Sequence, residues 1–199
     1  MIKIIDTHLH IWDRNYLNLP WLDGDTSVLS RNYSLADYEN SLNEKTLYKV
    51  EKAVYIEVDV LDSQKEKENE LIIDLCRIKG TLIKGAVISG DLTKESFADY
   101  IKKYNDIKCI KGVRQVLHVP SAKPKTCLSE IFIKNVKLLG KLGLVFEGCV
   151  RVEELGDLYM LAKECRDTVI ILNHIGIVDP DIISSVTPTD KETKYKEDW

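Results

Sequence analysis

Two kinds of segment alternate along the chain, and their order leaves few possible folds. Six short apolar runs, rich in β-branched residues, have the length of β-strands and lie at residues 2–5, 52–58, 82–88, 109–113, 144–149 and 168–172. Five longer segments between them repeat apolar residues every three or four positions, at residues 34–49, 64–79, 93–104, 128–142 and 153–165. Parallel strands need long crossover connections, so this order indicates a parallel sheet covered by helices. We therefore predict an α/β fold, either an open doubly wound sheet or a closed (β/α) barrel.

The length of the chain limits how many domains it can form. It has 199 residues, 44% of them hydrophobic, which suffices for one substantial core and is short for two domains. We expect a single domain over residues 1–199, with residues 178–199 as a polar tail or the beginning of a further loop and helix. For residues 15–31 we predict a long loop, of the kind that covers active sites.

Composition and charge argue against a nucleic-acid partner, a membrane partner and secretion. Lysine and arginine total 28 against 32 acidic residues, without a long block of one sign, which disfavours a nucleic-acid partner. We find no apolar run of secretory or membrane-spanning length, so we expect a cytoplasmic protein without a membrane partner. The cysteines are widely spaced and lack a C-x-x-C pair, which favours reduced thiols; they are Cys76, Cys109, Cys127, Cys149 and Cys165.

Two histidines follow the first apolar run, in Asp6-Thr7-His8-Leu9-His10-Ile11-Trp12-Asp13. Because they are two residues apart, His8 and His10 lie on one face of a strand end. Imidazole nitrogen is a common ligand of zinc, and such a pair supplies two of the three or four ligands required. Two polar residues on a solvated strand end would give the same pattern, so both interpretations stay open here.

A third histidine, His174, follows the apolar run 169–172 and Asn173, and so also occupies the carboxyl end of a strand. By itself it could be a hydrogen-bonded turn residue. Three histidines at equivalent strand ends nevertheless favour one convergent site, because the carboxyl ends of barrel strands meet at one face.

Charged residues at other strand ends are further candidates. Glu57, near the end of the second strand, could hold a substrate hydroxyl, a histidine or a metal, or reach solvent. Arg114, directly after the fourth strand, could bind a carboxylate or lactone oxygen with two hydrogen bonds, or form an ion pair between strands. Glu147 is a similar strand-end carboxylate, and His118 lies either at a pocket rim or in a loop.

Motifs of three other enzyme classes are absent from the sequence. The chain contains no G-x-S-x-G, no G-x-x-x-x-G-K and no G-x-G-x-x-G after a strand. Serine hydrolase, nucleotide hydrolase and dehydrogenase functions are therefore disfavoured.

Three ordered motifs carry a family resemblance: D-x-H-x-H-x-W-D at residues 6–13, K-G-V-R-Q at 111–115 and N-H-I-G at 173–176. With them the chain resembles the amidohydrolase-related family (amidohydrolase 2), in particular its lactonase branch of fuconolactonase-like and 2-pyrone-4,6-dicarboxylate lactonase-like enzymes. The resemblance implies a metal-dependent-hydrolase-type (β/α) TIM barrel of eight strands. It also implies His8, His10 and His174 as metal ligands, His174 as a catalytic residue, and Glu57 and Arg114 as substrate-binding residues.

The implied reaction is hydrolysis of a sugar-derived or dicarboxylic lactone, in which water attacks the ring carbonyl, with or without a divalent metal such as zinc. Two departures stand out. Asn173 replaces an aspartate that is common in relatives, and the essential aspartate of their last strand has no counterpart before Trp199. About six of eight barrel strands are recognisable, so we expect an incomplete, C-terminally truncated barrel.

Two alternatives to a lactonase stay open. One is other chemistry of the superfamily, namely zinc-dependent decarboxylation or amide hydrolysis. The other is a non-catalytic remnant that binds a small molecule or a partner. The unpaired sheet edges of an incomplete barrel invite association, so a homo-oligomer is also an expectation.

Overall fold

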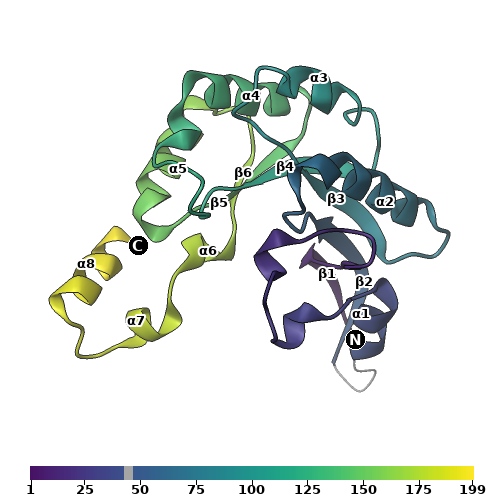
Figure 1. Cartoon of the computed structure of the whole chain (residues 1–199), viewed down its shortest axis with the longest axis horizontal. Coiled ribbons are helices and arrows are strands. Elements are labelled where there is room, and N and C mark those ends of the chain that lie inside the picture. The colour runs from purple at the N-terminus through teal and green to yellow at the C-terminus, as the bar shows by residue number, and fades with distance from the viewer. Residues whose placement is uncertain (43–46) are drawn as a thin grey trace. The chain divides into compact units, whose positions relative to one another are not determined.

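The structure, a computed structural model, describes residues 1–42 and 47–199 of the chain. Strands and helices alternate along the described residues, as Figure 1 shows. The strands are β1 (Ile2–Leu9), β2 (Tyr48–Ile56), β3 (Ile83–Ser89), β4 (Ile110–Val116), β5 (Val145–Cys149) and β6 (Ile170–Leu172). The α-helices are α1 (Leu35–Ser41), α2 (Lys65–Arg77), α3 (Phe97–Lys102), α4 (Glu130–Lys141), α5 (Leu155–Glu164), α6 (His174–Ile177), α7 (Pro180–Ser184) and α8 (Asp190–Asp198). The predicted alternation is confirmed.

The chain divides into two compact units. Unit 1 comprises residues 1–89 and 107–111, and unit 2 comprises residues 90–106 and 112–199. In unit 1, β1 pairs with β2 and β2 with β3, and both pairs are parallel. In unit 2, β4 pairs with β5 and β5 with β6, again in parallel. The expected single domain stays a prediction.

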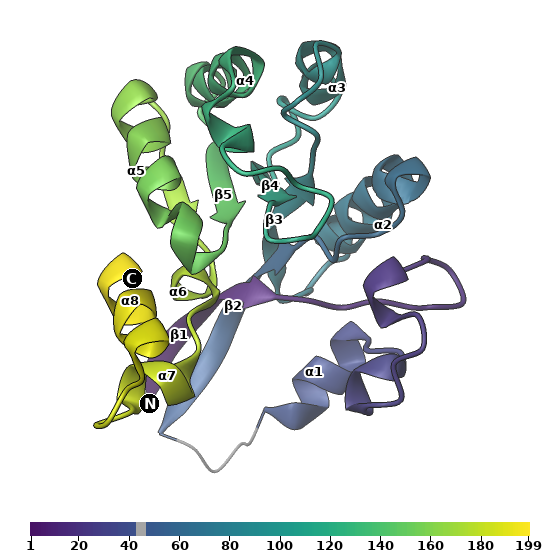
Figure 2. The same ribbon diagram turned by 60° about the vertical axis from the view of Figure 1, so that its left-hand side comes forward.

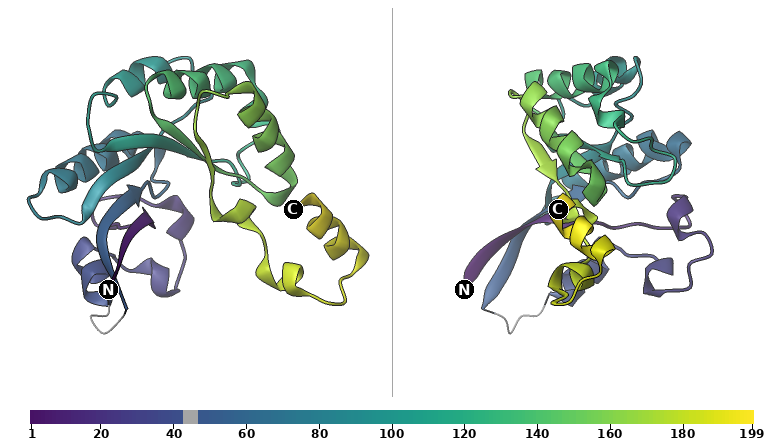
Figure 3. Two further views of the ribbon diagram at one scale, coloured as in Figure 1. Left: turned by 180° about the vertical axis from the view of Figure 1, so that it is seen from behind. Right: turned by 90° about the vertical axis from the view of Figure 1, so that its left-hand side faces the viewer.

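Each unit buries an apolar core between its strands and helices. In unit 1, the side chains of Tyr55 and Ile56 on β2 and of Ile72 on α2 are buried, and Figure 3 shows β1 and β2 side by side. In unit 2, Phe132 of α4 meets Phe146 of β5 edge-on, with ring centroids 5.5 Å apart. Helices α4 and α5 flank β5 in Figure 2. Truncating such a buried aromatic residue costs about 3–5 kcal/mol of stability.

The predicted helix over residues 34–49 is wrong in its second half. Helix α1 ends at Ser41, and β2 already begins at Tyr48, while residues 43–46 lie outside the described part. Tyr48 pairs with Ile2, and the next two residues pair in step with Lys3 and Ile4. Pairing with β1 therefore outweighs the helical spacing of this segment.

Two other predicted boundaries also shift. The helix expected over residues 93–104 is shorter, since α3 begins at Phe97. Before it, Oδ1 of Asp91 accepts hydrogen bonds from N and Oγ1 of Thr93, which holds the chain in a turn. Residues 178–199, expected as a polar tail or the beginning of a further loop and helix, contain α7 and α8, and α8 begins at a capping box of Thr189 and Glu192.

The long loop over residues 15–31 packs onto the rest of unit 1. Leu17, Leu19 and Leu22 are buried, and two 3-10 turns, Pro20–Leu22 and Val28–Ser30, shape the segment. Nε1 of Trp21 donates to the carbonyl oxygen of Val58 at 2.8 Å. The loop that follows β1 therefore covers the segment that follows β2. Among the described residues, no helix is long and apolar enough to cross a membrane.

Candidate active site

The two histidines of the opening motif meet in unit 1. His8 is the second-last residue of β1, and His10 comes directly after the strand, which ends at Leu9. Their Nε2 atoms are 3.1 Å apart, and their rings stand edge to face. Nδ1 of His10 lies 2.9 Å from the carbonyl oxygen of Ile56. A carbonyl oxygen can only accept, so neutral His10 carries its proton on Nδ1 and leaves Nε2 as an acceptor or a metal ligand.

This geometry fits a metal-binding pair. Two nitrogens that bind a tetrahedral zinc at about 2.0–2.1 Å lie about 3.3 Å apart, close to the observed separation. The bond from His10 to a backbone carbonyl is the arrangement that orients histidine ligands. Within each unit, and among the described residues only, no group of three or more His, Cys, Asp or Glu side chains could hold a metal ion. The pair by itself supplies two ligands.

Asp6 fixes the strand segment that carries the histidines. Its Oδ1 accepts from the backbone N–H of His8 at 3.0 Å, and its Oδ2 accepts from the hydroxyl of Tyr38 on α1 at 2.7 Å. Burial of the phenol, together with this bond and the charge of Asp6, raises the pKa of Tyr38 well above its usual value. Tyr38 is therefore a neutral donor that ties α1 to β1.

Glu57 is buried directly after β2, with 2% of its surface exposed. Its Oε2 accepts from the backbone N–H of Asp59 at 2.7 Å, and Asp59 takes a left-handed φ of 52°. The alternative in which Glu57 simply reaches solvent is therefore wrong. Its predicted role in binding substrate stays a prediction.

Glu68 on α2 is a buried acid that the sequence analysis missed. It is 1% exposed, and its Oε1 accepts from the hydroxyl of Tyr55 at 2.6 Å and from the backbone N–H of Val58 at 2.8 Å. Its other oxygen has no hydrogen-bond partner among the described residues. Burial, and then the charge of Glu57, raise the pKa of Glu68 to about 8. Its position four residues before the buried Ile72 was the available signal, because both then lie on one helix face.

In unit 2, three strands bring Arg114, Glu147 and Asn173 to one face of the sheet. Arg114 lies opposite Glu147 in the β4–β5 register, and Glu147 lies opposite Ile171 in the β5–β6 register. Asn173 follows Ile171 by two residues, so its side chain points to the same face. Its backbone N–H donates to the carbonyl oxygen of Gly148 at 3.0 Å, which continues the ladder past the end of β6.

These side chains form a buried hydrogen-bonded network. Nε of Arg114 donates to Oδ1 of Asn173 at 2.7 Å, and Nδ2 of Asn173 donates to Oε2 of Glu147 at 2.8 Å. Nη2 of Arg114 also lies 3.3 Å from Sγ of Cys149. The prediction that Arg114 follows its strand is wrong: β4 continues to Val116, which pairs with Cys149, and Arg114 lies inside it.

The two remaining histidines both lie in unit 2. His174 is the exposed first residue of α6 and takes a left-handed φ of 51°. Desolvation of its ring, and then the positive charge of Arg114, lower the pKa of His174. Its convergence with His8 and His10 of unit 1 stays a prediction. His118 is exposed in the loop after β4, which favours the loop interpretation.

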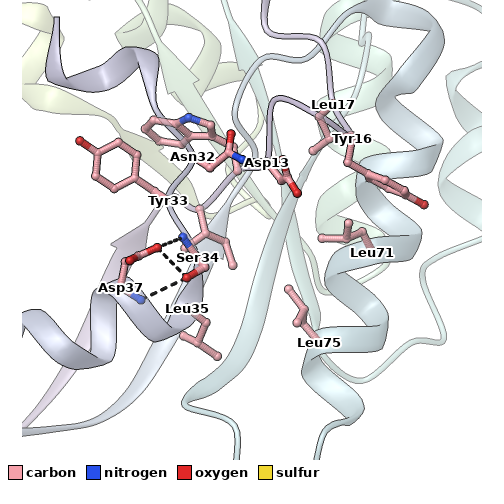
Figure 4. Close-up of a pocket in the computed structure, with 12 residues that line it drawn as sticks. Asp13, Tyr16, Leu17, Asn32, Tyr33, Ser34, Leu35, Asp37, Leu71 and Leu75 are labelled. Atoms are coloured by element: carbon pink, nitrogen blue, oxygen red, sulfur yellow. Dashed lines mark hydrogen bonds between the residues drawn. The ribbon is translucent and has the colours of Figure 1, made fainter.

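A cavity of about 430 Å³ lies beside the segment that follows His10 (Figure 4). Its wall combines apolar side chains with two acids that accept hydrogen bonds from neighbours: Asp37 accepts from the Ser34 hydroxyl and Asp13 from the Asn32 amide. It is lined by Ile11, Trp12, Asp13, Tyr16, Leu17, Asn32, Tyr33, Ser34, Leu35, Asp37, Leu71 and Leu75. His8 and His10 are not among these residues.

Comparison with known proteins places the chain in a family. The family model described as amidohydrolase matches residues 5–194. The uncharacterized protein y4mH of Sinorhizobium fredii is 25% identical over 191 residues, which cover 88% of this chain and 63% of that protein. The chain thus spans less than two thirds of the length of this curated relative.

Three solved structures share the fold. Amidohydrolase 2 from Bifidobacterium longum subsp. infantis superposes with a TM-score of 0.71 at 24% identity, covering 100% of this chain and 80% of that one. A zinc-bound amidohydrolase from Burkholderia multivorans gives a TM-score of 0.68 at 18% identity, covering 98% and 64%. A probable 2-pyrone-4,6-dicarboxylic acid hydrolase from Acinetobacter baumannii, with citric acid bound, gives 0.62 at 15% identity, covering 96% and 64%.

The order of elements and these superpositions agree. Within the described residues, parallel strands alternate with helices as they do in a (β/α) TIM barrel. About six of the eight strands of such a barrel are present. The family match extends over nearly the whole sequence. The chain belongs to the amidohydrolase family and has the fold of an incomplete TIM barrel.

Proposed function

We propose that this chain carries the histidine-lined part of a hydrolase site that opens a lactone ring, with a dicarboxylic or sugar-derived lactone as the substrate. The observation that carries the proposal is the meeting of the His8 and His10 Nε2 atoms at 3.1 Å. The likeness in fold to a probable 2-pyrone-4,6-dicarboxylic acid hydrolase supports a dicarboxylic lactone as the first substrate to test.

His8 and His10 would hold a divalent metal such as zinc, and His174 is proposed as a third ligand. The bond between Nδ1 of His10 and the Ile56 carbonyl supports this role, because it keeps Nε2 unprotonated. The zinc in the Burkholderia multivorans relative supports the choice of metal. When bound, such an ion polarises the ring carbonyl and makes a bound water more acidic.

The remaining proposed roles follow from charge and burial. Arg114 would bind a substrate carboxylate, because a planar guanidinium offers two parallel hydrogen bonds that suit a carboxylate. Glu57 would accept a hydrogen bond from a substrate hydroxyl, and its burial supports a fixed position for that acceptor. His174 is proposed to contact the reacting carbonyl.

Turnover of defined lactones tests the proposal. The chain, with zinc supplied, is assayed for ring opening of 2-pyrone-4,6-dicarboxylate by ultraviolet absorbance and of a sugar lactone by proton release. We expect His8→Ala and His10→Ala to lower kcat/KM by at least about 100-fold, since the loss of a metal ligand disables the site. His118→Ala is the matched control, because this histidine is exposed in a loop.

Two results would count against the proposal. One is equal losses in His118→Ala and His8→Ala, which would remove the paired histidines from the site. The other is decarboxylation or amide hydrolysis by the zinc-loaded chain without any lactone turnover, which would assign it a different reaction of the family.

A further inference from the structure

The side chain of Asn173 lies between a buried arginine and a buried glutamate of unit 2. Arg114, Asn173 and Glu147 are 6%, 3% and 4% exposed. The amide oxygen of Asn173 faces the guanidinium, and its nitrogen faces the carboxylate. A flipped amide would oppose donor to donor and acceptor to acceptor, so only one orientation is favourable.

An asparagine is the side chain that suits both neighbours here. An aspartate would bring a second carboxylate oxygen to about the 2.8 Å that separates Nδ2 of Asn173 from Glu147. An apolar residue would remove a partner from two buried charged groups, at a cost of a few kcal/mol. The backbone bond from Asn173 to Gly148 fixes where the side chain begins. The amide is therefore held from both ends.

The amide in turn restrains Arg114. A guanidinium is planar, so contacts at two of its nitrogens determine the plane of the whole group. Nε is held by Asn173 at 2.7 Å, and Nη2 by Sγ of Cys149 at 3.3 Å. Of these two, the bond to the amide oxygen is the stronger, because sulfur is a weak acceptor.

We propose that Asn173 is a positioning residue: braced by Glu147, its amide sets the plane of the Arg114 guanidinium and preorganises it to bind a carboxylate of the substrate. The inference rests on the proposed function, in which Arg114 recognises that carboxylate. Preorganisation raises affinity because the ordering cost is met before the ligand arrives.

An exchange of acid and amide between two positions tests the proposal. Asn173→Asp alone sets two carboxylates about 2.8 Å apart, and their repulsion should turn the side chain at position 173 away and remove the acceptor of Arg114 Nε. The double variant N173D/E147Q exchanges the two groups and leaves the total charge unchanged. Its carboxylate, now at position 173, can accept from both Arg114 and the amide now at position 147. Glu147→Gln alone is the control that keeps an acceptor for the Asn173 amide.

The first measurement reads the orientation of Arg114 without any ligand. In ¹⁵N NMR, the Arg114 Nε–H signal, assigned by its absence in Arg114→Lys, should be protected from exchange in the parent chain. We expect the signal to lose its protection in Asn173→Asp and to regain it in the double variant. Unchanged protection in Asn173→Asp would overturn the proposal. If this variant does not fold, Asn173→Ala takes its place with the same expectation.

The second measurement separates positioning from a general loss of structure. By calorimetry, Asn173→Asp should weaken binding of 2-pyrone-4,6-dicarboxylate about tenfold, a change of about 1.4 kcal/mol. Binding of uncharged 2-pyrone should change less than about twofold, and the double variant should recover dicarboxylate binding to within about threefold of the parent chain. Equal losses for both compounds, or no recovery, would overturn the proposal. If the parent chain binds no dicarboxylate, the proposed substrate fails, while the NMR signal still decides the role of Asn173.

Discussion

The Nε2 atoms of His8 and His10 lie 3.1 Å apart, and the opposite ring nitrogen of His10 lies 2.9 Å from the Ile56 carbonyl oxygen at the end of β2. The spacing of two residues across the end of β1 puts both rings on one side, and the parallel neighbour β2 supplies the acceptor that selects the tautomer of His10. The spacing in the sequence thus brings the two rings together, and the pairing of β1 with β2 orients the ring of His10.

Zinc affinity should depend on this pair. We expect His10→Ala to weaken zinc binding by at least about tenfold, because it removes a ligand nitrogen. Competition with a chromogenic chelator measures the dissociation constant. His118→Ala should bind zinc like the parent chain, and an equal constant for His10→Ala would exclude the pair as ligands.

The bond between Tyr38 and Asp6 should support the same segment. Tyr38→Phe removes the hydroxyl that donates to Oδ2 of Asp6, and we expect a loss of about 1 kcal/mol of stability. Urea unfolding measures the change. Tyr159→Phe is the control, since Tyr159 is 63% exposed, and an equally small effect of both changes would refute a supporting role for Tyr38.

Glu68 should make stability depend on pH. Folded Glu68 keeps its proton up to about pH 8, whereas the unfolded group releases it near 4.5. Between these values only the folded state holds the proton, so stability should fall as pH rises, by up to about 1.4 kcal/mol per pH unit. Glu68→Gln cannot ionise and should flatten this slope.

The matched control for this experiment is Glu70→Gln, an exposed residue of the same helix. Denaturant unfolding between pH 5 and pH 8 should give the parent slope for this control. If the stability of Glu68→Gln and of the parent chain changed with pH by the same slope, the buried acid would not titrate in this range.

Two helical glycines of unit 2 should respond oppositely to alanine. A Cβ at Gly140 of α4 would lie 2.4 Å from Oγ1 of Thr168 and 2.7 Å from the backbone oxygen of Asp167. Gly140→Ala should therefore cost about 1–3 kcal/mol. At Gly156 of α5 nothing lies within 4 Å, so Gly156→Ala should stabilise by up to about 1 kcal/mol. The midpoints of urea unfolding measure both changes. A stabilising effect of Gly140→Ala would contradict the close approach of α4 to Asp167 and Thr168.

The order of strands and helices, and the family, could be predicted from the amino-acid sequence. Hydrophobic periodicity is local, so the strand and helix types could be predicted from short windows, although their boundaries could not. Near Tyr48 the spacing of apolar residues predicted a helix, but this segment forms β2 because it pairs with β1, where Tyr48 lies opposite Ile2. The pairing of His8 with His10 was predictable for the same local reason, as side chains alternate along a strand.

Which buried polar and charged side chains contact one another became visible only in the folded chain. Arg114 and Asn173 are 59 residues apart in sequence, and Asn173 and Glu147 are 26 apart, yet strand register places all three on one face. For Glu68, the spacing of four residues from Ile72 indicates a shared helix face, but the side chains that contact Glu68 depend on what packs against α2. Such contacts depend on register and packing between distant segments, and no local pattern in the sequence encodes them.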